Sequence, residues 1–158
     1  MERIKKFLKN NWSFILTIVL ALIVRQTRIL GINIVEGVSM LPTLHNGQVV
    51  IGSSIKTLDR GDIVVAKTDK LVIKRIVGLP GENIKYTEGT LYINGKAYNE
   101  DYIEKGRDTR SKTQSWEFNL GEDEYLIAGD NRDDSYDGRY YGPLPKKSIL
   151  EKIYIRFK

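Results

Sequence analysis

Residues 71–81 read Leu71-Val72-Ile73-Lys74-Arg75-Ile76-Val77-Gly78-Leu79-Pro80-Gly81, an apolar run that ends in a Pro-Gly turn. The β-branched residues and the turn predict a strand over Leu71–Val77. Side chains alternate between the two faces of a strand, so Lys74 is expected to point the same way as Val72 and Ile76. Because apolar surroundings disfavour the ammonium form, the pKa of Lys74 is expected to be lowered.

Short apolar runs separated by turn residues continue on both sides of this strand. Because no long helical period appears among them, they predict a mostly β domain. The pairs Glu88-Gly89 and Asn94-Gly95 are tight-turn signals and predict a small meander over residues 83–99. The polar stretch Asp101–Ser115 is predicted to be an exposed loop. The other predicted strands are Ile32–Val38, Gln48–Gly52, Asp62–Lys67, Asn83–Thr87, Thr90–Ile93, Glu124–Ala128 and Ile149–Arg156.

A candidate nucleophile lies in the turn Gly37-Val38-Ser39-Met40-Leu41-Pro42-Thr43. A serine hydroxyl needs a neighbouring proton acceptor to attack at neutral pH, and an uncharged lysine amine can serve. Ser39 and Lys74 are therefore a candidate nucleophile and general base. Taken alone, each residue also fits an ordinary role, as a turn serine and as a solvated strand lysine.

The chain contains one histidine, His45, and no cysteine. This composition excludes thiol nucleophiles, disulfides and Cys/His zinc sites. It permits one triad, in which His45 is the base and Asp62 or Asp130 orients it. The turn Asn46-Gly47 follows His45 directly, so the imidazole is expected to face solvent. The formal net charge of +5 comes without a nucleic-acid-binding motif, which favours an anionic lipid surface over nucleic acid as a partner.

The N-terminus combines a basic cluster with an apolar stretch, Asn10–Val24, that carries no charge. At 1.5 Å per residue this stretch reaches roughly 22 Å, so flanking Lys9 and Arg25 would have to snorkel to span a ~30 Å hydrocarbon core. No small-x-small cleavage site follows it, which favours an uncleaved anchor over a cleaved signal peptide. The excess of basic residues before the stretch predicts a cytoplasmic N-terminus. The predicted organisation is a cytoplasmic basic tail over residues 1–9, a membrane anchor over 10–28 and an extracytoplasmic domain over 29–158.

A third segment, residues 129–145, mixes acids, arginines and turn formers. A calcium-binding loop starting at Asp133 would need a bidentate glutamate at its twelfth position, where the chain has Leu144. We therefore predict no metal and no cofactor. A solvated loop held by Asp–Arg pairs is the alternative to a functional loop.

Four segments, in this order, resemble the motif boxes of bacterial type I signal peptidases (leader peptidases), particularly the short Gram-positive form. The resemblance covers nearly the whole chain, and ordered agreement of several motifs is far more specific than any one of them. The boxes are Ser39-Met40-x-Pro42-Thr43, Arg60–Val65, Lys74–Glu82 and Gly129–Gly142.

The resemblance implies a mostly β, antiparallel-sheet catalytic domain of coiled, barrel-like form on a single N-terminal transmembrane helix. It implies a membrane-bound serine endopeptidase that removes N-terminal signal peptides from exported preproteins at the outer face of the cell membrane. Its partners would be those signal peptides and the lipid bilayer, with no nucleic acid, and the chain would be monomeric.

The resemblance also implies roles for single residues. Ser39 would attack the scissile carbonyl, Lys74 would be the general base, and Ser135 would orient the lysine amine. The backbone N–H of Ser39 and a contribution from Gly37 would stabilise the oxyanion. Relatives with serine at the Gly37 position can donate a hydroxyl, whereas glycine cannot. The residues implied to brace the site by ion pairing are Arg75, Asp130, Asp137 and Arg139.

An extended substrate would pair with the strand leading into the nucleophile and with the strand carrying Lys74. Two other interpretations remain open. A non-catalytic homologue assisting surface-protein or pilus assembly would be marked by loss of Ser39 or Lys74, and both are present. A self-cleaving Ser/Lys protease of the repressor type should carry a DNA-binding domain.

Overall fold

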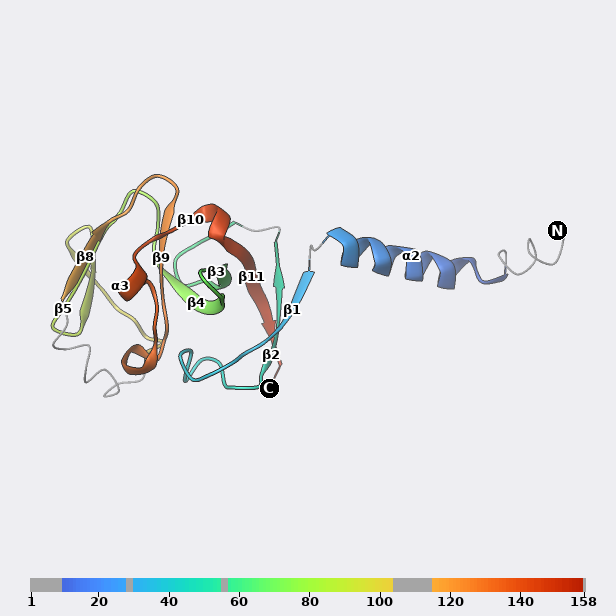
Figure 1. The fold of residues 1–158 in the computed structure, drawn as a ribbon, viewed down its shortest axis with the longest axis horizontal. Helices are drawn as coiled ribbons and strands as arrows, with labels where there is room; N and C mark the ends of the chain where they lie inside the picture. Colours follow the sequence, from blue (N-terminus) through green and yellow to red (C-terminus); the bar gives the residue numbers. More distant parts are fainter. Residues whose placement is uncertain (1–9, 28–29, 55–56, 104–114, 158) are drawn as a thin grey trace.

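The computed structural model describes residues 10–27, 30–54, 57–103 and 115–157 (Figure 1). Helix α2 (Trp12–Thr27) projects from a β domain that holds the other described elements. Within these four ranges, no helix is both long and apolar enough to cross a membrane. The anchor predicted over residues 10–28 is therefore not confirmed and stays a prediction. The basic tail predicted over residues 1–9 lies outside the described residues.

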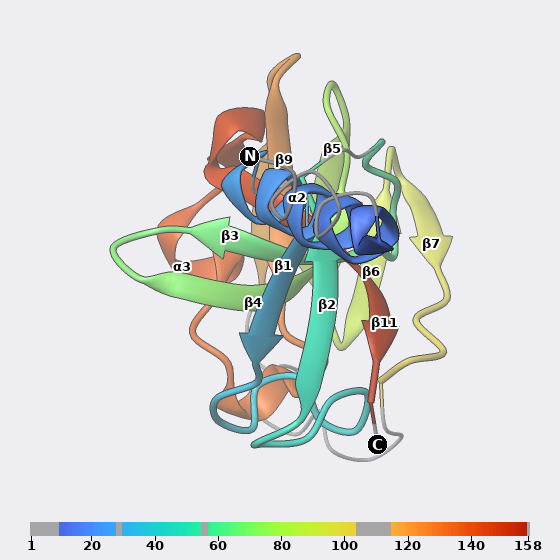
Figure 2. The ribbon, with the colours of Figure 1, turned by 90° about the vertical axis from the view of Figure 1, so that its right-hand side faces the viewer.

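The larger of two sheets is antiparallel throughout and has seven strands in the order β1-β2-β11-β3-β4-β9-β10. It curls into a half-barrel, as the change of strand direction from β1 and β2 to β3 and β4 in Figure 2 indicates. Among the described strands, β1 has a partner on one side only. The strands are β1 (Leu30–Ile34), β2 (Val49–Ser53), β3 (Ile63–Lys67), β4 (Leu71–Gly78), β9 (Glu124–Ala128), β10 (Leu144–Pro145) and β11 (Ile149–Arg156).

The smaller sheet has four strands in the order β7-β6-β5-β8. Its hairpin turns place Glu88, Gly89, Asn94 and Gly95 at positive φ, the conformation that tight two-residue turns require. The predicted meander over residues 83–99 is confirmed. The strands are β5 (Asn83–Thr87), β6 (Thr90–Ile93), β7 (Lys96–Tyr98) and β8 (Trp116–Asn119).

The observed strands agree with the predicted ones except near the nucleophile. The prediction of a strand over Ile32–Val38 was wrong at its end, because β1 stops at Ile34. Val35 then bonds to Gln48 and Gly47 across a loop, and Gly37 adopts a φ of 83°. Two strands, β8 and β10, lie outside the predicted ones, whereas β7 is the third strand of the predicted meander. Short helical turns also occur at η2 (Arg132–Asp134), α3 (Gly138–Tyr141) and η3 (Lys146–Ser148).

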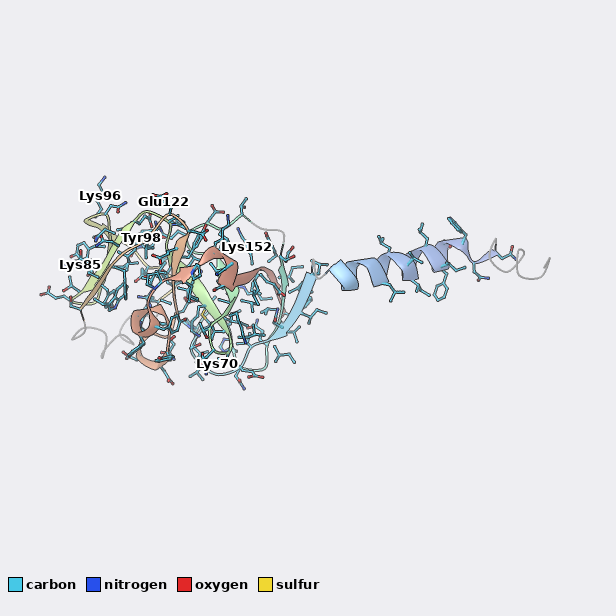
Figure 3. The ribbon with its side chains drawn as sticks, turned by 45° about the horizontal axis from the view of Figure 1, so that its top comes forward. Lys70, Lys85, Lys96, Tyr98, Glu122 and Lys152 are labelled. Carbon is cyan, nitrogen blue, oxygen red and sulfur yellow. The ribbon has the colours of Figure 1, made fainter. Side chains whose placement is uncertain are left out.

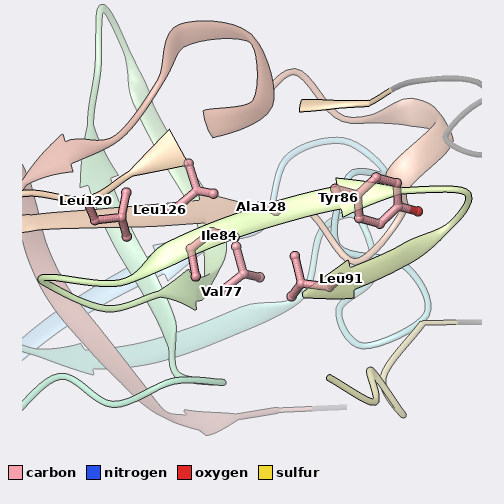
Figure 4. Packing of buried hydrophobic residues seen from close by; sticks show 7 residues of the cluster. All are labelled: Val77, Ile84, Tyr86, Leu91, Leu120, Leu126 and Ala128. Atoms are coloured by element: carbon pink, nitrogen blue, oxygen red, sulfur yellow. The ribbon is translucent and has the colours of Figure 1, made fainter. Parts of the chain in front are cut away.

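Three apolar clusters form the core. The first joins the two sheets and is shown in Figure 4, with Val77, Leu126 and Ala128 from the larger sheet against Ile84 and Leu91 from the smaller. Each of these side chains is essentially inaccessible to solvent. Full burial of one such side chain stabilises a fold by about 1.5–3 kcal/mol, so this cluster fixes the smaller sheet against the larger one.

The other two clusters lie on opposite faces of β4. Val72 and Ile76 pack in one of them and Ile73 in the other, as strand alternation requires. Because side chains alternate along β4, Lys74 lies on the face of Val72 and Ile76, as predicted. Met40 and Leu44, which flank the turn after Ser39, belong to the same cluster as Ile73.

Candidate active site

Ser39 and Lys74 are in direct contact. The Lys74 Nζ lies 2.7 Å from the Ser39 Oγ and donates to the Ile73 carbonyl at 3.0 Å. Lys74 is only 5% exposed, whereas Ser39 is half-buried. The two residues that the motifs singled out therefore meet at a hydrogen-bond distance suitable for proton transfer.

Burial is the main influence on the charge of Lys74. Desolvation lowers the pKa of Lys74 from its ordinary value, and the nearby ammonium of Lys70 adds to this effect. The carboxylates of Asp137 and Asp130 act in the opposite direction, but the net shift is downward. A lowered pKa enlarges the uncharged fraction of the amine, which is the form that accepts a proton.

The turn carrying Ser39 is held from two sides. Met40 and Leu44 are almost fully buried beneath it and fix its position by packing. Asn131 donates its backbone N–H to the Ser39 carbonyl at 3.0 Å and its side-chain amide to the Val38 carbonyl at 3.1 Å. The motifs indicated no role for Asn131, although it lies in the last motif box.

Gly129 allows this close approach. A Cβ built on Gly129 would lie 2.3 Å from the Ser135 Oγ and 2.5 Å from the Ser39 carbonyl oxygen, both far inside contact distance. Only glycine lets the 129–131 backbone lie against the nucleophile turn without displacing it. This requirement was also missed from sequence.

Arg75 and Asp130 form a bidentate ion pair next to Ser39 and Lys74, the candidate dyad. Arg75 Nε and Nη2 donate to the two carboxylate oxygens at 2.8 and 2.7 Å, and Nη1 donates to the Gly61 carbonyl at 2.6 Å. Burial alone would lower the pKa of Arg75, but the bonds to Asp130 reverse the direction and raise it. The pair fixes the strand residue beside Lys74 to the turn that contacts Ser39.

Asp137 is fully buried and collects several donors. Its carboxylate accepts from the Gly129 N–H at 2.8 Å, from the Ser135 hydroxyl at 2.6 Å and from Arg139 Nε at 2.8 Å. Burial would raise the pKa of Asp137, yet the bonds from Arg139 outweigh it and hold the pKa below its ordinary value. The Ser135 hydroxyl donates to Asp137 and keeps its acceptor lone pairs, and its predicted contact with the Lys74 amine stays a prediction.

Gly37 lies on the exposed side of the site. Its N–H donates to Asn46 Oδ1 at 2.8 Å, so this amide is already engaged. Among the described residues, none pairs with the N–H of Ser39, which leaves that donor available. The role of Gly37 in oxyanion stabilisation stays a prediction.

A groove of about 720 Å³ runs past the dyad. Its walls are the segment from Ile34 to Met40 and the strand segment from Lys70 to Lys74. Figure 3 labels Lys70 at the turn between β3 and β4, on a different part of the molecule from Lys85 and Lys96 of the smaller sheet. Asp134 and the exposed Tyr136 line the groove from the last motif box.

His45, the base of the alternative triad, lies apart from this groove. His45 is exposed and lines a separate depression with Asp62. Asp62 bonds to Lys152 at 2.7 Å, and Asp130 bonds to Arg75. Within the described part of the chain, no group of three or more His, Cys, Asp or Glu side chains could hold a metal ion.

Residues 6–158 match the family model described as signal peptidase, peptidase S26. The chain is 34% identical over 163 residues to signal peptidase I V of Bacillus subtilis, covering 92% of this chain and 96% of that one. It is 32% identical over 197 residues to signal peptidase I of Streptococcus pneumoniae, covering 99% and 96%.

The same similarity extends to a solved structure. The crystal structure of a signal peptidase I from Enterococcus faecalis superposes with a TM-score of 0.55 at 32% identity, covering 64% of this chain and all of that one. The match supports the mostly antiparallel fold and its curled sheet. Members of the matched family are associated with membranes and act as serine endopeptidases. By sequence and fold, the chain belongs to the signal peptidase I family.

Proposed function

We propose that this chain is a membrane-bound endopeptidase that uses a Ser39–Lys74 dyad to remove N-terminal signal peptides from exported preproteins. The observation that carries the proposal is the 2.7 Å distance between Nζ and Oγ at a lysine that is 5% exposed. A buried amine with a lowered pKa, in contact with a hydroxyl, is the arrangement that nucleophilic catalysis by serine requires.

In the proposed reaction the uncharged Lys74 amine takes the proton from the Ser39 hydroxyl as Oγ bonds to the scissile carbonyl carbon. The tetrahedral intermediate then expels the amine of the mature protein, which receives that proton from Lys74. An ester of Ser39 with the signal peptide remains. Water activated by the same amine hydrolyses the ester and restores both residues.

The developing oxyanion needs a donor fixed in advance. The N–H of Ser39 fits this role, because the bonds from Asn131 hold the turn and no described acceptor uses that N–H. Gly37 would contribute through its amide once the bond to Asn46 is exchanged for the substrate. Ser135, held by its bond to Asp137, would orient the Lys74 amine. The ion pairs Arg75–Asp130 and Arg139–Asp137 would brace the site.

The substrate would bind in extended form along the groove. β1 is an edge strand, and the groove walls include backbone on both sides of the dyad, so main-chain pairing can hold a peptide with little regard to most side chains. Small side chains before the cut fit the apolar lining by Ile34, Val72 and Ile73.

We further propose that residues 1–9 are a cytoplasmic tail, 10–28 a membrane anchor and 29–158 an extracytoplasmic catalytic domain that works as a monomer. Apolar side chains of α2 such as Trp12, Phe14 and Leu20 are more than half exposed in the chain alone. A lipid environment would remove this contiguous apolar surface from water.

The test is cleavage of preproteins by the purified full chain in detergent, followed by sequencing of the new N-termini. Ser39→Ala and Lys74→Ala should each abolish processing, because the dyad acts as a unit. Both variants should keep the wild-type melting temperature within a few degrees. Substantial turnover by either folded variant would reject the dyad, and a wild-type chain that cleaves no preprotein would favour the assembly-homologue alternative.

A further inference from the structure

A short segment after β7 contacts two arginines, Arg132 and Arg75, near Ser39 and Lys74. Glu100 and Tyr102 follow β7, where the chain leaves the smaller sheet. The Glu100 carboxylate lies 2.5 Å from Nη2 and 3.0 Å from Nη1 of Arg132. The Tyr102 hydroxyl donates to the same carboxylate, and the Tyr102 ring lies 4.1 Å from the guanidinium of Arg75.

Arg132 connects this segment to the nucleophile turn. Its Nε donates to the Gly129 carbonyl at 2.9 Å, and its own carbonyl accepts from Arg139 Nη2 at 2.8 Å. Gly129 lies against Ser39, and the next residue but one, Asn131, bonds to the Ser39 carbonyl. The side chain of Arg132 therefore fixes the backbone that holds Ser39.

Arg75 connects the segment to the base. It follows Lys74 in β4 and makes the bidentate pair with Asp130. The Tyr102 ring covers the guanidinium, and a cation over an aromatic face is held more firmly when both are shielded from water. The segment is thus connected to Ser39 through Arg132 and to Lys74 through Arg75.

We propose that Glu100 and Tyr102 are positioning residues for the reaction, with Glu100 holding Arg132 beneath the nucleophile turn and Tyr102 holding Arg75 beside the general base. The inference rests on the proposed function. Both residues act through the arginines, so their effect is on the distance and alignment between Nζ and Oγ.

Charge explains why Glu100 is needed. The side chains of Arg132 and Glu100 are only 1% and 7% exposed. Burial would lower the pKa of Arg132, and the carboxylate of Glu100 more than offsets this and raises it. Without the carboxylate a buried guanidinium lacks its counter-ion and must draw in water or shift. Either response moves the Gly129 carbonyl and, with it, the turn of Ser39.

A second triplet of the same residue types offers a matched control. Arg60 pairs with Glu82, donates to the Val77 carbonyl and lies 5.5 Å from the Tyr98 ring. Tyr98 belongs to the smaller sheet, where Figure 3 labels it, so this triplet also ties the two sheets together. The side chains of Arg60 and Glu82 are 16% and 17% exposed. Arg60 donates to β4, and none of the bonds named here runs to the 129–139 segment.

The experiment compares Glu100→Gln with Glu82→Gln in the full chain in detergent micelles. The substrate is a synthetic peptide that spans a cleavage site with alanine at the first and third positions before the cut. Measurements are kcat, KM, the melting temperature and the rate at which a fluorophosphonate labels Ser39. Glu100→Gln should lower kcat and the labelling rate together by about tenfold or more with KM within about twofold, because small misplacements are costly in catalysis. Glu82→Gln should lower the melting temperature and leave kcat within about twofold of wild type.

Wild-type kcat and labelling in folded Glu100→Gln would overturn the inference, and so would an equal loss of kcat in both variants. If Glu100→Gln does not fold, the variants Tyr102→Phe and Tyr102→Leu test the positioning role of the segment. Phenylalanine keeps the ring over Arg75 and should keep kcat within about threefold, whereas leucine should lose about tenfold. Equal rates for these two variants would reject the role of Tyr102. Turnover by Ser39→Ala or Lys74→Ala would instead reject the proposed function.

Discussion

Replacing Asp137 by asparagine removes one charge from the most densely bonded side chain near the dyad. Asp137 is fully buried, and its carboxylate accepts bonds from the Gly129 N–H, the Ser135 hydroxyl and the N–H, Nε and Nη2 of Arg139. An amide offers one acceptor oxygen and turns an NH₂ toward the remaining donors. The variant Asp137→Asn therefore leaves the buried guanidinium of Arg139 without its counter-ion.

Removing one partner of a buried ion pair costs about 3–5 kcal/mol. For a chain of this size each 1 kcal/mol shifts the melting temperature by about 2–4 °C, so we expect a fall of about 6–20 °C at pH 7. The matched control is Asp123→Asn, an exposed aspartate in the turn before β9, which should melt within about 2 °C of wild type.

The loss of stability in Asp137→Asn should also depend on pH. The pKa of Asp137 is lowered in the folded chain, so its stabilisation is present above the unfolded value and is lost as pH falls through the folded pKa. The gap in melting temperature between wild type and Asp137→Asn should therefore shrink in acid. Thermal melts by circular dichroism across this range test the reasoning. A variant that melts within about 2 °C of wild type at pH 7, or a gap that widens in acid, would refute it.

Three further outcomes are expected. The value of kcat/KM should rise with pH through a pKa of Lys74 below 10.5, because burial favours the uncharged amine that accepts the proton, and a pH-independent profile would contradict this. Gly129→Ala should lower the free energy of unfolding by about 1–3 kcal/mol and kcat by at least about tenfold, because the added methyl would overlap Ser39 and Ser135. Wild-type kinetics in this variant would show that the turn can move freely. His45→Gln should retain most of the wild-type rate, since the exposed imidazole lines a different depression from the dyad, and an inactive variant would restore the triad hypothesis.

Periodicity in the sequence predicted most of the sheets. Strands with strong alternation or with flanking Asn-Gly and Glu-Gly turns, such as Thr90–Ile93, matched the structure at both ends. β8 (Trp116–Asn119) was missed because it has only four residues and follows a long polar stretch, so its pairing with β5 is decided by tertiary contacts. β10 (Leu144–Pro145) has two residues, too few for any period.

The residues of the candidate site could be predicted where a motif indicates their chemical role. The hydrogen bonds and ion pairs between loops could not. Ser39 and Lys74 were identified from their motifs and lie in contact. The bond from Gly37 to Asn46 and the pairing of Glu100 with Arg132 depend on how loops meet in space, which local sequence does not encode. The bond from the Ser135 hydroxyl to the fully buried Asp137 carboxylate likewise depends on how the 129–139 segment folds.

The two Arg–Asp pairs limit how far two nearby carboxylates raise the pKa of Lys74. Asp130 and Asp137 both raise the pKa of Lys74, so unpaired carboxylates here would draw a proton onto the amine and leave it unable to act as a base. Arg75 and Arg139 each occupy one carboxylate with two or more hydrogen bonds. The hydrogen-bond partners of the amine are then neutral, the Ser39 hydroxyl and the Ile73 carbonyl, and burial is the largest influence on its pKa. The arginines thus compete with the proposed base for the two carboxylates, and this competition favours a lowered pKa of Lys74 in a site dense in charge.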